Sequence, residues 1–502
     1  MHDRATITKL PLLVSIMLAC GTAGIDDSVT DGSNSDSTET GVATTTGDGD
    51  MSCDGELGCA CALNETCVDD LMCSEGTCVS STCGDGVISA GESCDDANVT
   101  NSDGCNADCQ PTEVVEISAG GYHTCALFNS GEARCWGRGN YGQLGQGNTN
   151  LIGDSETPAS ALAIVLAAPI ISIRAGDQHT CALLDTGGVA CWGLAALGRL
   201  GYANTSNIGD DELPVVAGTV QLGEVAIAID AGDTYTCALL NTGYPICWGS
   251  GGYHLGQEDT NNHLGDDEHP GSAAVIDVGS TSSMIVAGSS SACALRDDDE
   301  LICWGNNSYG ELGLVSLSNQ IPISQAIGMP AQIPKPPLML DFGSQHACAI
   351  FKDTNHLSCW GHHASGRLGY PGQAEDIGDN EQPGNSVVLG GTPIAVATGD
   401  AHSCAVLEDG DVLCWGQASA GQLGYGNTNI IGDNETPEAA GAVAIGGPAV
   451  AVTAGRQHTC ALRDDNEVVC WGEGSWGALG YGTPADIGDN ETPETAGVVE
   501  VY

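Results

Sequence analysis

Basic residues are scarce in this chain of 502 residues, which has 12 lysines and arginines against 66 aspartates and glutamates. A net charge of −54 repels phosphate backbones and anionic lipid surfaces, and this excludes nucleic-acid binding. Aromatic residues are also few, at 4%. The sequence has no nucleophile elbow, phosphate-binding loop or metalloprotease motif, so we expect no catalytic residues and no enzyme activity. The acidity serves either solubility or an acidic surface that collects cations or a basic partner.

Long apolar runs are missing too. The run Leu10–Ala19 is too short to span a bilayer as a mature helix. It follows a weakly basic start and ends at Cys20, which resembles a bacterial lipobox, although Met17 stands where leucine is usual. We predict a signal peptide over 1–20 with a lipidated Cys20, and an ordinary secretory signal is the alternative. Residues 21–52 are Ser, Thr, Gly and Asp with little to bury, which predicts a disordered acidic tether.

Cysteine, in contrast, is abundant, with 25 residues. One is Cys20, ten lie between Cys53 and Cys109, and fourteen form pairs ten or eleven residues apart. An even remainder in an exported protein predicts disulfides, and zinc is disfavoured because the pairs contain no CxxC. The seven predicted bridges are Cys125–Cys135, Cys181–Cys191, Cys237–Cys247, Cys293–Cys303, Cys348–Cys359, Cys404–Cys414 and Cys460–Cys470.

The ten remaining cysteines define a module over 53–110. Its first part, 53–82, is too short for a hydrophobic core, so cross-links must hold it. Its second part, 83–110, reads CGDGVISAGESCDDANVTNSDGCNADCQ and resembles the cysteine-rich repeat common in exported proteins of myxobacteria and their relatives. Oxygen-bearing side chains cluster there, and they are either calcium ligands or parts of Asx-turns. These residues are Asp95, Asp96, Asn98 and Asp103.

Residues 111–502 are periodic, with the first cysteine of each pair recurring every 55 or 56 residues. Each of the seven copies has an alternating apolar segment, a GxxHTCAL-type segment, a turn, a segment ending in CWG, and a glycine-rich corner such as YGQLG. About four short strands fit such a copy, which is the content of one propeller blade. The sequence therefore predicts an all-β fold, a seven-bladed β-propeller of about 56-residue repeats, preceded by a small disulfide-rich module.

The GxxH(T/S)xAL segment, the WG ending and the GQLG corner resemble the repeat of the regulator of chromosome condensation family, whose fold is a seven-bladed propeller. This chain adds a cysteine pair to every repeat and an acidic loop to most of them. The resemblance implies binding of proteins. The activity that names the family is nucleotide exchange on a small GTPase, but export and the lack of basic surface argue against it here. Exported relatives of this kind inhibit a secreted enzyme by binding it on one face.

Within each repeat, the cysteines bracket a turn and should lie opposite each other on neighbouring antiparallel strands. The tryptophan after the second cysteine points to the other face of its strand, and we interpret it as packing between blades, with a carbohydrate platform as the alternative. Five histidines recur two residues before a cysteine, and we expect a structural hydrogen bond inside each blade rather than a metal site. The C-terminal segment 497–502 is expected to complete the blade begun by the N-terminal strand.

An acidic loop with the pattern GD(D/N/S)ExP occurs in six repeats and is missing from the fourth. Its residues Asp154 and Glu156, and Asp433 and Glu435 in the sixth repeat, are predicted calcium ligands, while ordinary turns are the alternative. Calcium is the only cofactor that the sequence suggests.

We therefore expect an exported, lipid-anchored propeller at the cell envelope, on the outer membrane or the cell surface. Its predicted partner is a protein or peptide bound on one face. The alternatives are a structural envelope or matrix protein without a specific ligand, and an inhibitor of a secreted enzyme.

Overall fold

A computed structural model describes residues 71–74, 77–80, 83–84, 86, 88, 92–258, 260–352 and 356–502. The predicted signal peptide with Cys20, the tether and the cysteines from Cys53 to Cys67 lie outside these residues. None of the helices in the described part of the chain has the length and hydropathy of a membrane span.

Contacts divide the chain into two compact units. One contains a hairpin of β1 (Leu71–Ser74) and β2 (Thr77–Ser80). The other comprises Cys83–Ile88 and Glu92–Tyr502.

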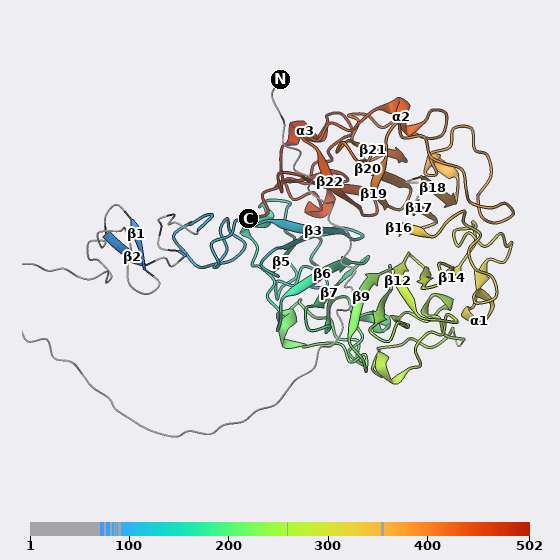
Figure 1. Cartoon of the computed structure of the whole chain (residues 1–502), viewed down its shortest axis with the longest axis horizontal. Helices are drawn as coiled ribbons and strands as arrows, with labels where there is room; N and C mark the ends of the chain where they lie inside the picture. Colours follow the sequence, from blue (N-terminus) through green and yellow to red (C-terminus); the bar gives the residue numbers. More distant parts are fainter. Residues whose placement is uncertain are drawn as a thin grey trace, which may run out of the picture. The chain divides into compact units, whose positions relative to one another are not determined.

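The second unit contains seven antiparallel sheets arranged around one axis, as Figure 1 shows. The all-β, seven-bladed propeller predicted from the sequence is thus confirmed. The first strands of the blades are β3 (Val114–Ala119), β6 (Ile170–Ala175), β9 (Ala226–Ala231), β12 (Ser282–Ala287), β16 (Pro337–Phe342), β19 (Pro393–Thr398) and β22 (Ala449–Ala454). The second strands are β4 (His123–Phe128), β7 (His179–Leu184), β10 (Tyr235–Leu240), β13 (Ser291–Arg296), β17 (His346–Phe351), β20 (His402–Leu407) and β23 (His458–Arg463). The third strands are β5 (Ala133–Gly137), β8 (Val189–Gly193), β11 (Pro245–Gly249), β14 (Leu301–Asn306), β18 (Leu357–Gly361), β21 (Val412–Gly416) and β24 (Val468–Gly472).

The second strand of each blade lies between two strands and between two neighbouring blades. Its side chains are therefore covered on both faces, and every residue of β4 is buried. This explains why β4 continues from Cys125 as Cys-Ala-Leu-Phe without polar alternation. The turn to the third strand needs a left-handed residue, which Gly131 provides in the first blade with φ 81°.

Each blade is completed by residues of its own repeat. In the first blade Ile164 pairs with Ala133, and in the last Val499 pairs with Val468. The prediction that the C-terminal segment completes the blade begun by the N-terminal strand is therefore wrong. The segment after each acidic loop returns to the third strand of the same repeat. Each repeat therefore forms one blade, and no strand is exchanged between the first and last repeats.

Short helices mark the two kinds of loop that follow the third strand. Corner loops contain η2 (Ala196–Gly198), η4 (Tyr253–Leu255), η6 (Ala364–Gly366) and η7 (Ser475–Gly477). The prolines of acidic loops begin η1 (Pro158–Ser160), η3 (Pro214–Val216), η5 (Pro270–Ser272), α2 (Pro437–Ala440) and α3 (Pro493–Ala496). The fourth blade instead has β15 (Gln320–Ile321) and α1 (Ile323–Ala326), which matches the missing acidic loop.

The paired cysteines of all seven blades are directly opposed and bonded. Cys125 lies opposite Cys135 in the register of β4 and β5, with 4.0 Å between their Cα atoms. The other six pairs have Cα distances of 4.0–4.1 Å. Each bridge thus closes a hairpin, as the spacing predicts.

The tryptophans of the WG endings are fully buried, which confirms their packing role and excludes them as an exposed platform. Trp192 donates its indole N–H to the carbonyl of Gln143 in the preceding blade, at 3.0 Å. Trp136 does the same to Ala478 of the seventh blade, at 3.0 Å. The junction of the last and first blades is therefore built like that of the first and second.

The recurrent histidines connect neighbouring blades. His123 Nε2 lies 2.9 Å from Thr180 Oγ1 of the next blade, and Thr180 donates to the carbonyl of Gln143 at 2.9 Å. Since the hydroxyl proton is used on that carbonyl, the imidazole donates from Nε2. The expected bond inside each blade is therefore wrong: the bond is structural, but it runs between blades.

A close approach near the axis explains the glycine of the GxxH motif. A Cβ on Gly120 would lie 2.2 Å from the carbonyl oxygen of Gly176 in the next blade, and one on Gly455 would lie 2.4 Å from that of Gly120. No side chain fits there, so glycine lets the first strands approach one another.

Residues 92–110 contact the first blade. Asn106 donates to the side chain of Asn129 at 2.8 Å, and Ser102 donates to Glu132 at 3.0 Å. Cys94 is bonded to Cys105. The domain limits predicted from the sequence stay predictions.

Candidate functional site

One face of the propeller carries turns whose side chains differ between repeats. Its turns are held alike in every blade: the residue after WG donates its main-chain N–H to the carbonyl of the residue before the recurrent histidine position, as Arg138 does to Tyr122 at 2.9 Å. We call the surface formed by these turns and the adjoining glycine-rich corners the corner face. The fold fixes its backbone, so its side chains are free to differ between blades.

Near the axis, the residue after the GxxH glycine forms a ring of mixed chemistry. Arg456 of the seventh blade forms an ion pair with Asp177 of the second at 2.9 Å and lies 3.8 Å from Asp233 of the third. Gly121 in the first blade leaves the space that this pairing needs, since a Cβ there would lie 2.1 Å from Asp177 Oδ1. The full ring is Gly121, Asp177, Asp233, Ser289, Ser344, Asp400 and Arg456.

Burial and mutual repulsion act on these carboxylates. The pKa of Asp400 is raised to about 6 by burial, with Asp233 and Asp177 adding repulsion and Arg456 opposing it. The pKa of Asp177 is raised as well, mainly by burial. The three acids thus face Arg456 at the axis, while Arg199 and Arg367 also lower the pKa values of Asp177 and Asp400.

A second cluster lies where the first and seventh blades meet. The guanidinium of Arg138 lies over the rings of Trp476, Tyr122 and Tyr141, at 5.0, 5.5 and 5.8 Å from their centroids. These are cation–π distances. Trp476 is 45% exposed and has a left-handed backbone with φ 67°. Nε of Arg138 is buried and has no hydrogen-bond partner among the described residues.

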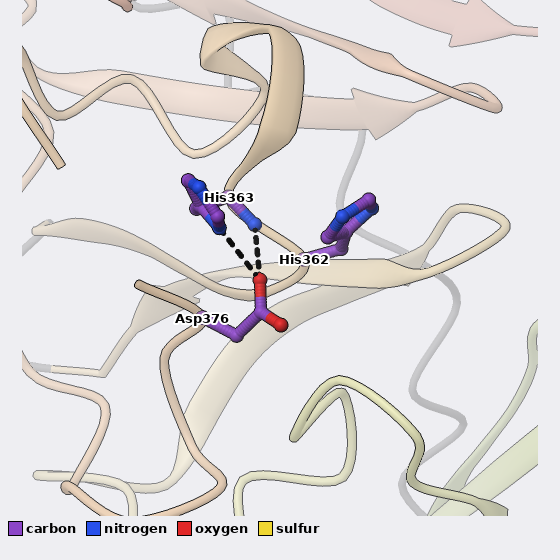
Figure 2. Close-up of side chains that lie close together, drawn as sticks. All are labelled: His362, His363 and Asp376. Carbon is purple, nitrogen blue, oxygen red and sulfur yellow. Dashed lines mark hydrogen bonds and ion pairs between the residues drawn. The ribbon is translucent and has the colours of Figure 1, made fainter. Parts of the chain in front are cut away.

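A third cluster, in the fifth blade, contains His362, His363 and Asp376 (Figure 2). Asp376 Oδ1 lies 2.8 Å from His363 Nδ1 and accepts the main-chain N–H of His363 at 2.9 Å. His362 Nδ1 lies 3.0 Å from Gln345 Oε1. Burial and the nearby Arg367 lower the pKa of His362, which favours its neutral form.

The predicted calcium ligands of the cysteine-rich module are brought together only in part. Asp95 accepts the N–H groups of Gly84, Gly86 and Ala97. Asn98 donates to Asp103 at 3.2 Å, and the pKa of Asp103 is raised by burial. Asp96 accepts from Cys105 N at 3.2 Å and from Asn98 N at 3.4 Å. Their oxygens bind loop amides, which is the Asx-turn arrangement, and calcium here stays a prediction.

The predicted ligands of the acidic loops lie at the surface. Ser155 donates to Glu156 at 2.5 Å and to Asp154 at 3.4 Å. The pKa of Glu435 is raised by burial and by repulsion from Asp433. The loop's contact with the preceding blade is made by glycine: a Cβ on Gly432 would lie 2.4 Å from the carbonyl of Gly366. The loop thus packs against the preceding blade through its backbone rather than through its carboxylates.

Comparison with known proteins identifies the repeat. A model described as the RCC1-like domain matches residues 79–429, and models of the regulator of chromosome condensation (RCC1) repeat match residues 409–462 and 449–477. The chain belongs to the RCC1-like family. The family predicted from the sequence is confirmed.

RCC1-like relatives include the ultraviolet-B receptor UVR8 of Arabidopsis thaliana, which is 30% identical over 385 residues, or 75% of this chain and 80% of UVR8. The E3 ubiquitin-protein ligase HERC2 of Homo sapiens is 28% identical over 323 residues, which cover 63% of this chain but 6% of HERC2. Among solved structures, yeast RCC1 (Prp20) bound to Kap60 has a TM-score of 0.54 at 18% identity, covering 76% of this chain and 84% of that one. Human WBSCR16 has a TM-score of 0.56 at 16% identity, covering 70% and 86%.

The three clusters of the corner face were not found from the sequence. Aligning the repeats with one another would have indicated two of these clusters. His363 occupies a position where the other repeats have Gly, Ala or Asn. Arg456 occupies a position where three repeats have Asp. For the cluster of Arg138 the sequence offers less, because Trp476 and Tyr122 lie at opposite ends of the domain and meet only through ring closure.

Proposed function

We propose that this protein is an exported, lipid-anchored propeller that binds a protein or peptide partner at the cell envelope through its corner face. Protein binding is a property of relatives with this fold: yeast RCC1 (Prp20) binds Kap60, and Prp20p of Saccharomyces cerevisiae has been studied for binding to Gsp1p and histones.

The cluster of Arg138 and Trp476 carries this proposal. Arginine and tryptophan dominate binding energy at protein interfaces, because they bury large surfaces and combine apolar and polar contacts. Here Trp476, in a glycine-rich corner, is 45% exposed, whereas the seven tryptophans of the WG endings are fully buried. Its ring centroid lies 5.0 Å from the guanidinium of Arg138.

The axial cluster indicates the chemistry of the partner. Burial raises the pKa values of Asp177 and Asp400 and Asp233 repels both, so a cationic side chain from a partner would favour their charged forms. The chain's net charge of −54 also attracts basic partners during diffusion and increases their association rate. We therefore propose a partner that presents lysine or arginine to the axis.

Export is supported by the disulfides, because seven bridged hairpins form and persist in an oxidising compartment. The anchor is supported by the sequence around Cys20 alone. A Cys20→Ala variant should no longer be labelled by a fatty acid or partition into detergent, whereas Cys83→Ala should behave like the wild type. A wild-type protein recovered without lipid would refute the anchor but not the binding function.

The binding function is tested by affinity capture from envelope extracts with wild type, an Arg138→Ala/Trp476→Ala variant and a Val216→Ser control. Val216 is 74% exposed on the helix of an acidic loop, so its replacement changes an exposed apolar residue away from the cluster. The expected partner binds wild type and the control and is lost with the double variant. Equal capture by all three proteins, or no specific partner, would favour the structural envelope protein. Loss of a secreted enzyme's activity in the bound fraction would identify the partner as an inhibited enzyme.

A further inference from the structure

The fifth blade differs from the other six directly after its WG ending. His362 and His363 occupy two positions that other blades fill without histidine. The second position in particular holds a small residue in most blades, so the fold does not require an imidazole at 363. The corresponding pairs are Arg138-Gly139, Leu194-Ala195, Ser250-Gly251, Asn306-Asn307, Gln417-Ala418 and Glu473-Gly474.

Asp376 has a structural role that an amide also fulfils. Its Oδ1 accepts the main-chain N–H of His363, and Asn207 accepts the corresponding N–H of Ala195 in the second blade at 3.1 Å. In the third blade His263 accepts from Gly251 at 2.9 Å. In the seventh blade Asp486 accepts from Gly474 at 2.9 Å, so a carboxylate at this position also occurs without a histidine. What distinguishes the fifth blade is the second contact of its carboxylate, with the imidazole of His363.

The second imidazole is held in place from two sides. His362 stacks on Tyr309 with 4.2 Å between the ring centroids, and its Nδ1 is 3.0 Å from Gln345 Oε1. Figure 2 shows the side chains of His362 and His363 on either side of the Asp376 carboxylate. One ligand atom from each of the three residues lies within 4.8 Å of the others.

We propose that His362, His363 and Asp376 bind one transition-metal ion of the zinc class. Two imidazoles and a carboxylate suit Zn²⁺, Ni²⁺ or Cu²⁺, whereas Ca²⁺ and Mg²⁺ prefer oxygen ligands throughout. Zinc ligands stand about 2.0–2.2 Å from the metal, so the three atoms close inwards on binding. The side chains of His363 and Asp376 are 32% and 22% exposed, which leaves a path for the ion.

Three protein ligands leave a coordination position open toward solvent. The site lies on the corner face, so water or a side chain of a partner can complete it. The site itself does not depend on the proposed partner, because all three ligands belong to this chain.

The test measures Zn²⁺ binding to the full chain purified without a histidine tag, in millimolar Ca²⁺ and Mg²⁺ that occupy oxygen-only sites. We expect one Zn²⁺ per chain. His363→Ala introduces the residue that the second blade has at this position. Asp376→Asn keeps an acceptor for the main-chain N–H, as Asn207 does in the second blade. Each substitution should weaken Zn²⁺ binding by about tenfold or more. His263→Asn is the matched control. His263 occupies in the third blade the loop position that Asp376 has in the fifth, and the third blade has no histidines at the positions of His362 and His363.

Electron paramagnetic resonance of bound Cu²⁺ distinguishes this site from the acidic loops. The wild type should show hyperfine coupling to the nitrogens of two imidazoles, and His363→Ala should show coupling to one at most, with all variants folded as judged by circular dichroism. Binding that is equal in wild type and His363→Ala, a spectrum with oxygen ligands only, or no binding in the presence of Ca²⁺ and Mg²⁺ would each overturn the proposal.

Discussion

The imidazole of His458 in the seventh blade and the hydroxyl of Thr124 in the first lie 3.0 Å apart, although 334 residues separate them in the chain. Thr124 also donates to the carbonyl of Ala478 at 3.1 Å. The ring therefore closes without an exchanged strand, through the same histidine–hydroxyl contact that joins His123 to Thr180.

Removal of this hydroxyl should destabilise the whole propeller. Thr124→Val leaves the buried N–H of His458 without an acceptor, and an unsatisfied buried donor costs about 1–3 kcal/mol. We expect a loss of about 2 kcal/mol in the free energy of unfolding, measured by denaturant titration with the disulfides intact. Thr495→Val is the control, because its hydroxyl bonds to a carbonyl at the surface. Equal effects of the two substitutions would show that ring closure does not depend on this contact.

The buried histidines should make the fold sensitive to acid. Burial, together with His458 and Arg367, lowers the pKa of His402 to about 3, and burial lowers that of His458 to about 4. Their unfolded pKa is about 6.5, so below that pH the unfolded chain takes up protons that the native state does not. Their stabilising contribution is complete above pH 6.5 and falls as the pH decreases, by up to about 1.4 kcal/mol per histidine and pH unit.

The measurement compares the wild type with His402→Gln between pH 7.5 and 4.5. The free-energy advantage of the wild type should shrink as the pH falls. The comparison is needed because burial raises the pKa of Asp400 and Asp230 to about 6, which stabilises the native state in the same range as the pH decreases. If the difference in the free energy of unfolding between the two proteins stays constant with pH, the pKa of His402 is not lowered in the native state.

Local pattern explains what the sequence could predict. The cysteine pairs, the turns and the recurring WG endings lie within one hairpin of each blade, so spacing alone determines their partners. The partner of His123 lies 57 residues away in the next blade, and spacing gives no indication of it. His363 and Asp376 meet because the chain returns to the turn 13 positions later, and the sequence does not encode that path in any motif.

The disulfide pattern should be local. Peptide mapping under non-reducing conditions should find each predicted pair within its own blade, and a Cys181→Ala/Cys191→Ala variant should lose about 2–3 kcal/mol of stability. Cys83 and Cys109 have free thiols in the structure, and burial together with Cys83 raises the pKa of Cys109 to about 12. Bridges between blades, or free thiols at the paired positions, would contradict the hairpin arrangement.

The carboxylates of the acidic loops should repel one another more than they support the fold. In the sixth blade burial and, to a smaller extent, repulsion from Asp433 raise the pKa of Glu435, while the loop's contact with the preceding blade is made by Gly432. An Asp433→Asn/Glu435→Gln variant should therefore be at least as stable as the wild type when both are unfolded thermally at low salt in the presence of a chelator.

If these residues bind Ca²⁺, millimolar calcium raises the melting temperature of the wild type by mass action and raises that of the variant less. Magnesium should act weakly, since it dehydrates reluctantly and demands stricter geometry. We expect calcium to change the melting temperature of both proteins equally, because the loops contact the neighbouring blade through their backbone and not through these carboxylates. A shift in the wild type that the variant lacks would instead establish the predicted calcium site.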